Sequence, residues 1–504
     1  MQPRSGILHS LEAGLRAGGV SKVRKALLTV NISKLKREEL LQVSNLARRA
    51  GVPLIALRAL GSIVHQNREI HSPATVEELA SYAIALHKVG ASGEAQMLLK
   101  PLNGKTHPQV LLYRAFVHFS KWEYREPIHD LQQFIEAKGL SSYERLVGQL
   151  NLAAAFVTEE LYTDAETLLS NIFSIAKQHS FSAVYSSALE LSAQLSYARR
   201  DFQRGLKYLT EARELTEAQT EAQLAWVDKW QCLIELAQHG VTSSGLDRLH
   251  KIRAASILRG DSETCRECDL REAILSQNLD LFVRVYAGTP FSAYRKRMFR
   301  LWTPMSSLPQ TLRWTPPGSL VGHGELDLQL GRTNTGIEVK PGQSTHRLLW
   351  AMSLDFYRHS SVGSLFHVLF ADQYFDPETS RDRVQAIIYR SREWLQQNKI
   401  TLSIQMRHAN IGGQYYLESS PNFGLRVFCE RGHAPPTNEE VMLSRIETTW
   451  SQNKFTASEA CKKLGLSLGT VVSILNWGQE RNLVQKIGQR RQTQYLILKR
   501  TGSD

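Results

Sequence analysis

The stretch NLAAAFVTEELYTDAETLL, residues 151–169, contains the pattern that decides the fold of the first half of the chain. Small residues at Ala153 and Ala154 come before a short polar break, Tyr162 follows the break, and Ala165 opens a second apolar stretch. Apolar residues three and four positions apart predict a helix on each side of the break. The stretch therefore predicts two helices joined by a short turn, with small residues that let the helices pack closely.

The same order of small, aromatic and small residues recurs along the first half of the chain. The corresponding positions are separated by 32, 38 and 40 residues and are Ser92, Tyr124, Tyr162 and Phe202. Such a period is typical of stacked helical repeats, and the pattern resembles tetratricopeptide (TPR) repeats over roughly residues 75–240. We expect residues 1–285 to form a TPR-like helical repeat domain; a generic α-helical bundle is the alternative. The resemblance implies a surface that binds a protein or peptide partner or that self-associates.

The charge of the chain is concentrated in its last part. The 504 residues carry a net charge of +13, and residues 291–504 hold 27 Lys and Arg against 17 Asp and Glu. A local basic excess favours a polyanionic partner, although a solvated surface gives the same count. No apolar run is long enough for a membrane span and no secretory signal is recognisable. The five scattered cysteines fit a reducing compartment, so we expect a cytoplasmic protein.

The pattern of polar and apolar residues changes after the proline-rich residues 303–318. We interpret residues 286–318 as a linker. Residues 325–330 alternate polar and apolar residues and predict a strand, a helix is expected over 346–354 and a longer one over 380–397, and strand-like segments follow at 402–406 and 412–417. This order predicts a winged helix over residues 319–425.

The helix VQAIIYRSREWL, residues 384–395, resembles the recognition helix of the OmpR/PhoB-type DNA-binding domain, with Ser391 where that family has leucine. The resemblance implies contacts with double-stranded DNA, since arginine and glutamine read base edges and arginine also binds phosphates. A solvated amphipathic helix is the alternative. The candidate residues on this helix are Arg381, Arg383, Gln385, Tyr389, Arg390 and Arg392.

A second helix-turn-helix is predicted after another linker, residues 426–437. Residues 456–471 read TASEACKKLGLSLGTV and look like the T-x-x-E-x-A-x-x-L-G-L-S…T-V pattern of many bacterial winged-helix domains. We assign residues 438–500 to this domain, and residues 481–500 hold six cations and no acid. Some domains of this kind bind protein instead of DNA. The candidate DNA-binding residues here are Thr470, Ser473, Asn476, Lys486, Arg490 and Arg491.

The sequence thus predicts a mainly α fold, a TPR-like α-solenoid followed by two winged helix-turn-helix (α+β) domains. We find no nucleotide-binding loop, nucleophile motif or zinc motif, so we expect no enzyme activity, cofactor or metal. Cys265 and Cys268, one helical turn apart, lack the second ligand pair that zinc requires. The leading hypothesis is a DNA-binding transcriptional regulator whose repeats bind a partner. The second is an adaptor whose repeats and winged helices both serve protein assembly.

Overall fold

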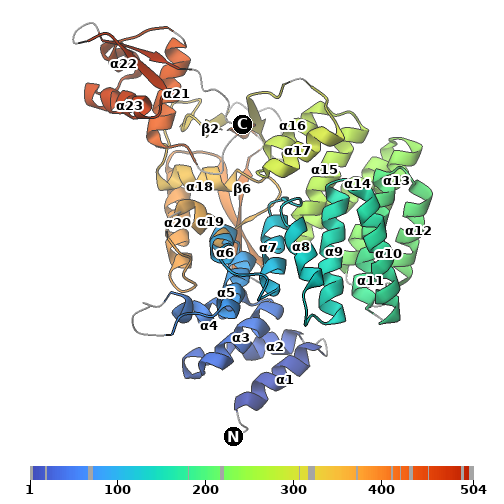
Figure 1. Ribbon diagram of the computed structural model, residues 1–504. Helices are drawn as coiled ribbons and strands as arrows, with labels where there is room; N and C mark the ends of the chain where they lie inside the picture. The colour runs from blue at the N-terminus through green and yellow to red at the C-terminus, as the bar shows by residue number, and fades with distance from the viewer. Residues whose placement is uncertain are drawn as a thin grey trace. The chain divides into compact units, whose positions relative to one another are not determined.

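The structure is a computed structural model, and it shows a chain that is helical up to residue 301 and mixed thereafter (Figure 1). It describes residues 4–16, 20–65, 72–179, 181–215, 221–305, 307–315, 324–370, 373–409, 412–420, 422–430, 435–451, 453–489 and 493–498. Among these residues, none of the helices combines the length and the apolar character that a membrane span needs.

The first part of the chain is a series of helices with short connections. They are α1 (Arg4–Arg16), α2 (Val20–Leu28), the short 3₁₀ helix η1 (Ile32–Lys34), α3 (Arg37–Arg49), α4 (Pro53–Val64), α5 (Val76–Val89), α6 (Ser92–Leu99), α7 (Gln109–Phe119), α8 (Ile128–Glu136), α9 (Ser142–Thr158), α10 (Tyr162–Gln178), α11 (Ser182–Ala198), α12 (Phe202–Glu214), α13 (Glu221–His239), α14 (Ser243–Arg259), α15 (Ser262–Leu275), α16 (Leu279–Ala287) and α17 (Ser292–Leu301). The part of the expected 1–285 domain that precedes residue 75 is helical and contains α1 to α4.

Local capping residues define where several of these helices begin and end. Thr75 accepts a hydrogen bond from the Glu78 amide, and the Glu78 carboxylate accepts one from the Thr75 amide, so α5 starts with a capping box. It ends at Gly90, whose φ of 97° lies in the left-handed region that favours glycine. Ser141 and Glu144 form the same reciprocal pair at the start of α9. These capping residues lie within a few positions of the helix ends, so the local sequence defines the helix bounds.

The helices stack as an α-solenoid. Each helix from α3 to α15 packs against the next one, and α3, α5, α9, α11 and α13 also pack against the next odd-numbered helix. This second set of contacts is what a repeat array has, since each pair buries its apolar face against the following pair. Three of the four repeat positions fit this arrangement, because Ser92, Tyr162 and Phe202 are the first residues of α6, α10 and α12, whereas Tyr124 lies before the start of α8.

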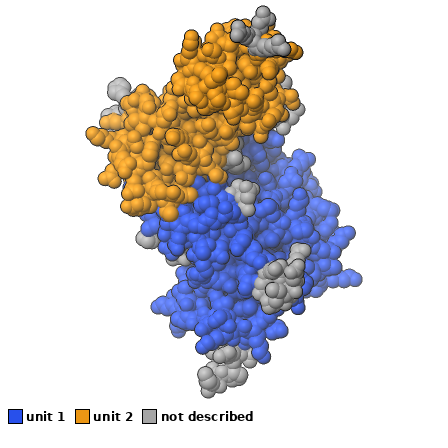
Figure 2. Space-filling view, turned by 90° about the vertical axis from the view of Figure 1, so that its left-hand side faces the viewer, with its two compact units in different colours: residues 1–309, 354–385, 405–416 blue, residues 310–353, 386–404, 417–504 orange. Residues whose placement is uncertain are grey.

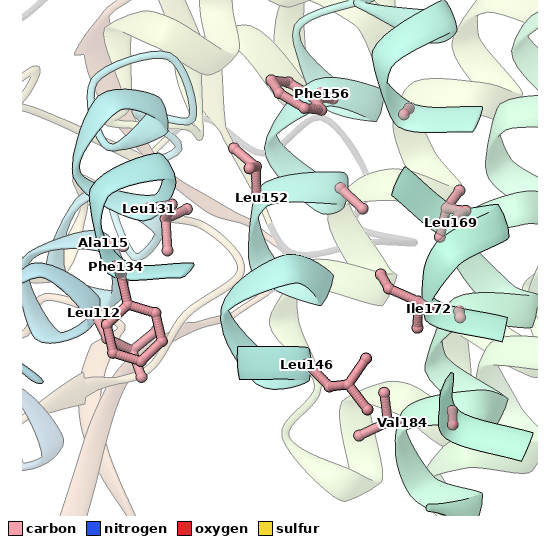
Figure 3. Close-up of a cluster of buried hydrophobic side chains, with 14 of the residues drawn as sticks. Leu112, Ala115, Leu131, Phe134, Leu146, Leu152, Phe156, Leu169, Ile172 and Val184 are labelled. Carbon is pink, nitrogen blue, oxygen red and sulfur yellow. The ribbon is translucent and has the colours of Figure 1, made fainter. Parts of the chain in front are cut away.

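The core of the middle repeats is built from large residues on one helix and small residues on its neighbour. Leu131, Phe134, Leu146, Leu152, Phe156, Leu169 and Ile172 belong to one buried cluster, and Figure 3 shows Leu152 on the side of α9 that faces Leu131 of α8. The helix α9 also contributes Gly148, where a Cβ atom would lie 2.5 Å from the Phe134 ring. The close approach of α8 and α9 therefore requires glycine here, which is the role that the sequence predicted for small residues.

The second part of the chain contains three small sheets and six helices among the described residues. The strands are β1 (Thr311–Trp314), β2 (Gly324–Asp327), β3 (Arg332–Thr333), β4 (Ser360–Ser361), β5 (Leu402–Ala409), β6 (Gly412–Ser419), β7 (Phe423–Phe428), β8 (Val484–Ile487) and β9 (Gln494–Ile497). The helices are α18 (Ser344–Met352), α19 (Val362–Leu369), α20 (Ser380–Gln397), α21 (Asn438–Trp450), α22 (Ala457–Leu464) and α23 (Leu468–Glu480). The strand orders are β1-β7-β2-β3, β4-β6-β5 and β8-β9.

Both segments that we interpreted as linkers contain secondary structure. Residues 286–318 include α17 and β1, and residues 426–437 begin with the last part of β7. Strand β7 pairs antiparallel with β1 and parallel with β2, so these prolines and glycines flank strands of one sheet. The predicted strand over 325–330 ends at Asp327, where the Asp327 carboxylate accepts a hydrogen bond from the Leu330 amide and turns the chain.

The chain forms two compact units, coloured separately in Figure 2. The first unit comprises residues 1–309, 354–385 and 405–416, and the second comprises residues 310–353, 386–404 and 417–504. The range 319–425, which the sequence analysis predicts as one domain, is thus divided between the two units. Segments 354–385 and 405–416 belong to the same unit as the helical array.

Candidate nucleic-acid interface

Helices α22 and α23 are joined by a tight turn that the local sequence explains. Thr456 and Glu459 form a capping box at the start of α22, and Gly465, with a φ of 67°, ends it. Ser467 then accepts a hydrogen bond from the Thr470 amide and starts α23. Ala460 of α22 and Val471 of α23 are completely buried in one core with Ile474 and Leu475. This core fixes which face of α23 is left to solvent.

The exposed face of α23 is polar and carries one acid, the exposed Glu480 at its end. Thr470, Ser473 and Asn476, three residues apart, are all exposed, as the sequence analysis requires of residues that contact a partner. The Thr470 hydroxyl lies 2.8 Å from the Ser467 hydroxyl, so it is partly engaged within the cap. Leu468, at the first position of the helix, has 58% of its surface exposed. The face therefore offers hydroxyl and amide groups together with one apolar side chain.

Cations lie on the elements that come directly before and after α23 in the chain. Lys462 and Lys463 are exposed at the end of α22, and the Lys463 ammonium lies 5.7 Å from the centre of the Trp450 ring. Lys486 is exposed on β8, in the hairpin that follows α23. Arg481 stacks on Trp477 at 4.5 Å. The remaining candidates of this hairpin, Arg490 and Arg491, lie outside the described residues.

Two of the candidate arginines of α20 have partners within the protein, although Arg392 is exposed at the surface. The guanidinium of Arg383 lies 4.0 Å from the centre of the Phe370 ring and 5.3 Å from that of Phe366. Arg392 donates hydrogen bonds from Nε and Nη2 to the Ile404 carbonyl oxygen, at 2.9 and 2.7 Å. Both side chains stabilise the surroundings of α20, a role that their positions in the sequence do not reveal.

The other candidates of α20 lie on a face of mixed charge. Arg381, Tyr389 and Arg390 are exposed, and Gln385 is half-buried. Asp382 and Glu393 are exposed on the same helix, and a hydrogen bond to Glu393 raises the pKa of the Tyr389 hydroxyl. A polyanion would meet both acids on this face. Ser391, which stands where the family helix has leucine, is buried and donates a hydrogen bond to the Thr345 hydroxyl at 3.1 Å.

The segment before α20 is held on the helical array, which the sequence analysis missed. Helix α19 packs against α5 and α6, and the Ser361 hydroxyl donates a hydrogen bond to the Val89 carbonyl at 2.8 Å. Farther along, the Phe375 amide donates one to the buried Glu94 carboxylate, also at 2.8 Å. These contacts join residues more than 270 positions apart, so no local pattern could have indicated them.

The composition of α15 indicates that a later segment of the chain packs on the helical array. Its residues Arg266, Glu267, Asp269 and Arg271 are all buried, although helices normally place charged residues in solvent. Asp355 accepts two hydrogen bonds from Arg266, and the Tyr357 hydroxyl donates one to Asp269 at 2.9 Å. A charged helix without an apolar stripe thus indicates a polar partner elsewhere in the chain.

The cysteine pair of α15 is part of the core. Cys265 and Cys268 are both buried as free thiols, and burial raises the pKa of Cys265 to about 11 and that of Cys268 further. Thiols with such raised pKa values are inert, since the thiolate is the reactive and metal-binding form. Within the described part of the chain, no group of three or more His, Cys, Asp and Glu side chains is arranged to hold a metal ion.

No family model and no curated protein matches the chain. Solved structures of Rap proteins are similar in part. The Rap protein complexed with competence and sporulation factor is 11% identical with a TM-score of 0.42, and the match covers 59% of this chain and 86% of that one. The Rap conjugation gene regulator of plasmid pLS20 in complex with the Phr* peptide is 8% identical, with a TM-score of 0.36 over 59% and 92% of the two chains. The apo form of RapI is 13% identical, with a TM-score of 0.36 over 56% and 85%.

Proposed function

We propose that the chain is a non-enzymatic regulator that binds double-stranded DNA through α23, while its helical array binds a protein or peptide partner or a second copy of the chain. The observation that carries the proposal is the exposure of Thr470, Ser473 and Asn476 on one face of α23. The opposite face of the same helix is locked in the core by Val471, Ile474 and Leu475. A helix held in this way can enter a major groove and present its free side chains to base edges.

The elements around α23 support the same proposal. Three helices followed by a two-stranded hairpin is the order of a winged helix, in which the hairpin lies beside the recognition helix. Asn476 can pair with an adenine through two hydrogen bonds, and Ser473 and Thr470 can bond to several base edges. Lys462, Lys463 and Lys486 would bind phosphates, which gives affinity and orientation but no sequence preference. We propose fewer DNA contacts for α20 than for α23, because Arg383 and Arg392 already have partners within the protein.

A specific observation also favours the second candidate, a protein-assembly adaptor. The exposed face of α23 carries no cation in the part of the chain that the structure describes, and its Leu468 is 58% exposed. The centre of a protein–protein interface is depleted of charged residues, so a face without cations fits a contact with another protein. The two candidates differ in what the face would recognise, so a binding experiment separates them.

The test measures binding of the full-length protein to a randomised duplex library and then to the selected sequences at several salt concentrations. We expect a selected sequence, and a loss of preference by about 1–3 kcal/mol at one base pair in Asn476→Ala. Lys486→Gln should weaken binding to all duplexes. It should also reduce the slope of the logarithm of the binding constant against the logarithm of salt concentration by about one. Lys177→Gln, on the exposed side of α10, is the matched control and should change neither. No binding to any duplex at low salt would exclude DNA as the partner and leave the adaptor.

A further inference from the structure

A cavity of about 400 Å³ lies inside the first compact unit. One wall comes from the helical array, chiefly the end of α5 from His87 to Gly90. The other wall comes from residues 358–364, 375–381 and 413–414, which the chain adds much later. The volume is within the range of sites for small organic ligands, which is roughly 300–1,000 Å³.

The residues that line this cavity are strongly biased in charge. They include three cations, Lys88, Arg358 and Arg381, two imidazoles and four serines, and among the described residues of the lining none is Asp or Glu. Clefts lined by one sign of charge raise the local concentration of oppositely charged ligands. The lining therefore favours an anion.

The three cations differ in how far they are already occupied. Arg358 donates a hydrogen bond to Glu263 at 2.7 Å and stacks on the Phe291 ring, so its guanidinium is held in place and largely neutralised. Lys88 and Arg381 form no ion pair in the part of the chain that the structure describes. Lys88 and Arg381 are both exposed, and partial burial together with the charge of Arg48 lowers the pKa of Lys88. An anion bound in the cavity beside them would provide a counter-ion.

The histidine in this wall is neutral and cannot repel or attract a ligand by charge. Burial lowers the pKa of His87 to about 4, and the neighbouring charges of Lys88, Arg358 and Lys121 act in the same direction. Its Nδ1 atom lies 3.0 Å from the Ser92 hydroxyl, which fixes the ring. The lowered pKa of this histidine comes first from burial and only secondarily from the surrounding cations.

The cavity also has an apolar side. Leu54, Phe375 and Pro377 line it together with the charged residues, and Phe375 is almost fully buried. A bare inorganic ion would leave this side in contact with water only. A ligand with an apolar or aromatic body would contact it and release that water.

The two walls of the cavity are in close contact with each other. A Cβ atom on Gly90 would lie 2.1 Å from the Ser361 hydroxyl, and one on Gly363 would lie 2.5 Å from the Val89 carbonyl oxygen. Ser361 itself hydrogen-bonds to the Val89 carbonyl. The cavity is thus bounded by a preformed packing of α19 on the end of α5, as ligand sites usually are.

From these observations we propose that the cavity binds a small organic anion, whose phosphate or carboxylate group lies between Lys88 and Arg381 and whose apolar body contacts Leu54 and Phe375. The site does not depend on the DNA-binding proposal, because none of its residues belongs to α22 or α23. A small molecule bound in this cavity would contact both the helical array and the segment that leads into α20.

The test is calorimetric titration of the full-length protein with phenyl phosphate, benzoate, inorganic phosphate and phenol. We expect one binding site for phenyl phosphate or benzoate, and at least about tenfold weaker binding of inorganic phosphate and phenol. Tighter phenyl phosphate identifies a phosphate ligand, and tighter benzoate identifies a carboxylate. Lys88→Gln and Arg381→Gln should each weaken the tighter ligand by about tenfold or more. Lys177→Gln is the matched control and should not.

A second measurement uses the unaltered protein. Its lysines are acetylated with a limiting amount of acetic anhydride, with and without the aromatic anion, and each site is quantified by mass spectrometry. Lys88 should be protected by the ligand and Lys177 should not. The proposal is overturned if neither aromatic anion binds, if phenol binds as tightly as phenyl phosphate and benzoate, or if Lys88 stays equally reactive while an anion is bound.

Discussion

Arg266 of α15 donates two hydrogen bonds from Nη2 to the carboxylate oxygens of Asp355, at 2.8 and 2.7 Å, across 89 positions of sequence. The Arg266 side chain is fully buried, and its guanidinium also lies within 5.6 Å of the centres of three aromatic rings, those of Phe291, Tyr294 and Tyr357. The pair fastens residues 354–358 to the end of the helical array.

We predict that Asp355→Ala strongly destabilises the first unit. The substitution leaves the Arg266 charge buried without its main counter-ion, which typically costs about 3–5 kcal/mol. The free energy of unfolding, from urea titration followed by circular dichroism, measures this. Glu12→Ala removes one partner of the more exposed Arg49–Glu12 pair and is the control. It should change stability by about 1 kcal/mol or less. Equal effects of both substitutions would contradict the importance of the buried pair.

We predict that Gly363→Ala loosens the packing of α19 on α5. The added Cβ would lie 2.5 Å from the Val89 carbonyl oxygen, and because this atom belongs to the backbone, α19 must move. Overpacking of this kind costs about 1–3 kcal/mol, measured again from urea unfolding. Gly469→Ala in α23 is the control, since its Cβ would have no neighbour closer than 4.0 Å. That substitution should be neutral or stabilise by up to about 1 kcal/mol.

We predict a pH dependence of stability that comes from Glu94. Burial raises the pKa of this carboxyl group to about 7, against the opposing hydrogen bond from the Phe375 amide. The folded protein therefore holds a proton that the unfolded chain releases near pH 4.5. The contribution of Glu94 is full below pH 4.5 and decreases as the pH rises to about 7.

Glu94→Gln should remove this decrease. The free energy of unfolding of the wild type minus that of the variant should therefore fall as the pH rises from 4.5 to about 7. The comparison with the variant is needed because His87 acts in the opposite direction. Its pKa is lowered to about 4, so its contribution is present above pH 6.5 and is lost as the pH falls toward 4. A constant difference between wild type and Glu94→Gln from pH 4.5 to 7 would show that Glu94 titrates normally.

We predict that a single cysteine reacts quickly with a dithiobis(nitrobenzoate) reagent in the folded protein. Cys461 is half-buried, whereas Cys232, Cys265, Cys268 and Cys429 are buried. With a pKa of about 11, Cys265 has roughly 0.1% thiolate at pH 8, which slows its reaction further. Cys461→Ser should abolish the fast phase, measured by absorbance, and leave four slow thiols. A fast phase that persists in this variant would mean that the core around α15 opens readily.

The sequence predicted what depends on neighbouring residues. Helix α20 spans Ser380–Gln397 as expected, and the small residues of α9 pack as the repeat pattern requires. In α23, Ser467 and Val471 fix the start of the helix and its buried face, and the candidate residues of this helix are exposed. Contact with DNA stays a prediction for all of these residues.

The features that sequence reasoning missed depend on distant partners. Strands β1 and β2 have only four residues each, and their main partner, β7, begins almost 100 residues after β2. The candidate Arg392 binds a carbonyl of a later strand, and Arg383 stacks on an earlier helix. Nothing in the local pattern separates such an arginine from one that is free to bind a phosphate.

The position of β7 between β1 and β2 has a consequence for how the protein is made and where it can be shortened. Both β1 and β2 stay without their shared neighbour until residue 428 has left the ribosome, so this sheet must close late, after the array has had time to fold. A chain ending at residue 430 keeps all three strands and removes only α21 to β9, whereas one ending at residue 420 exposes two strand edges to aggregation. The boundary between a tolerated and a harmful truncation is therefore set by six residues, Phe423–Phe428.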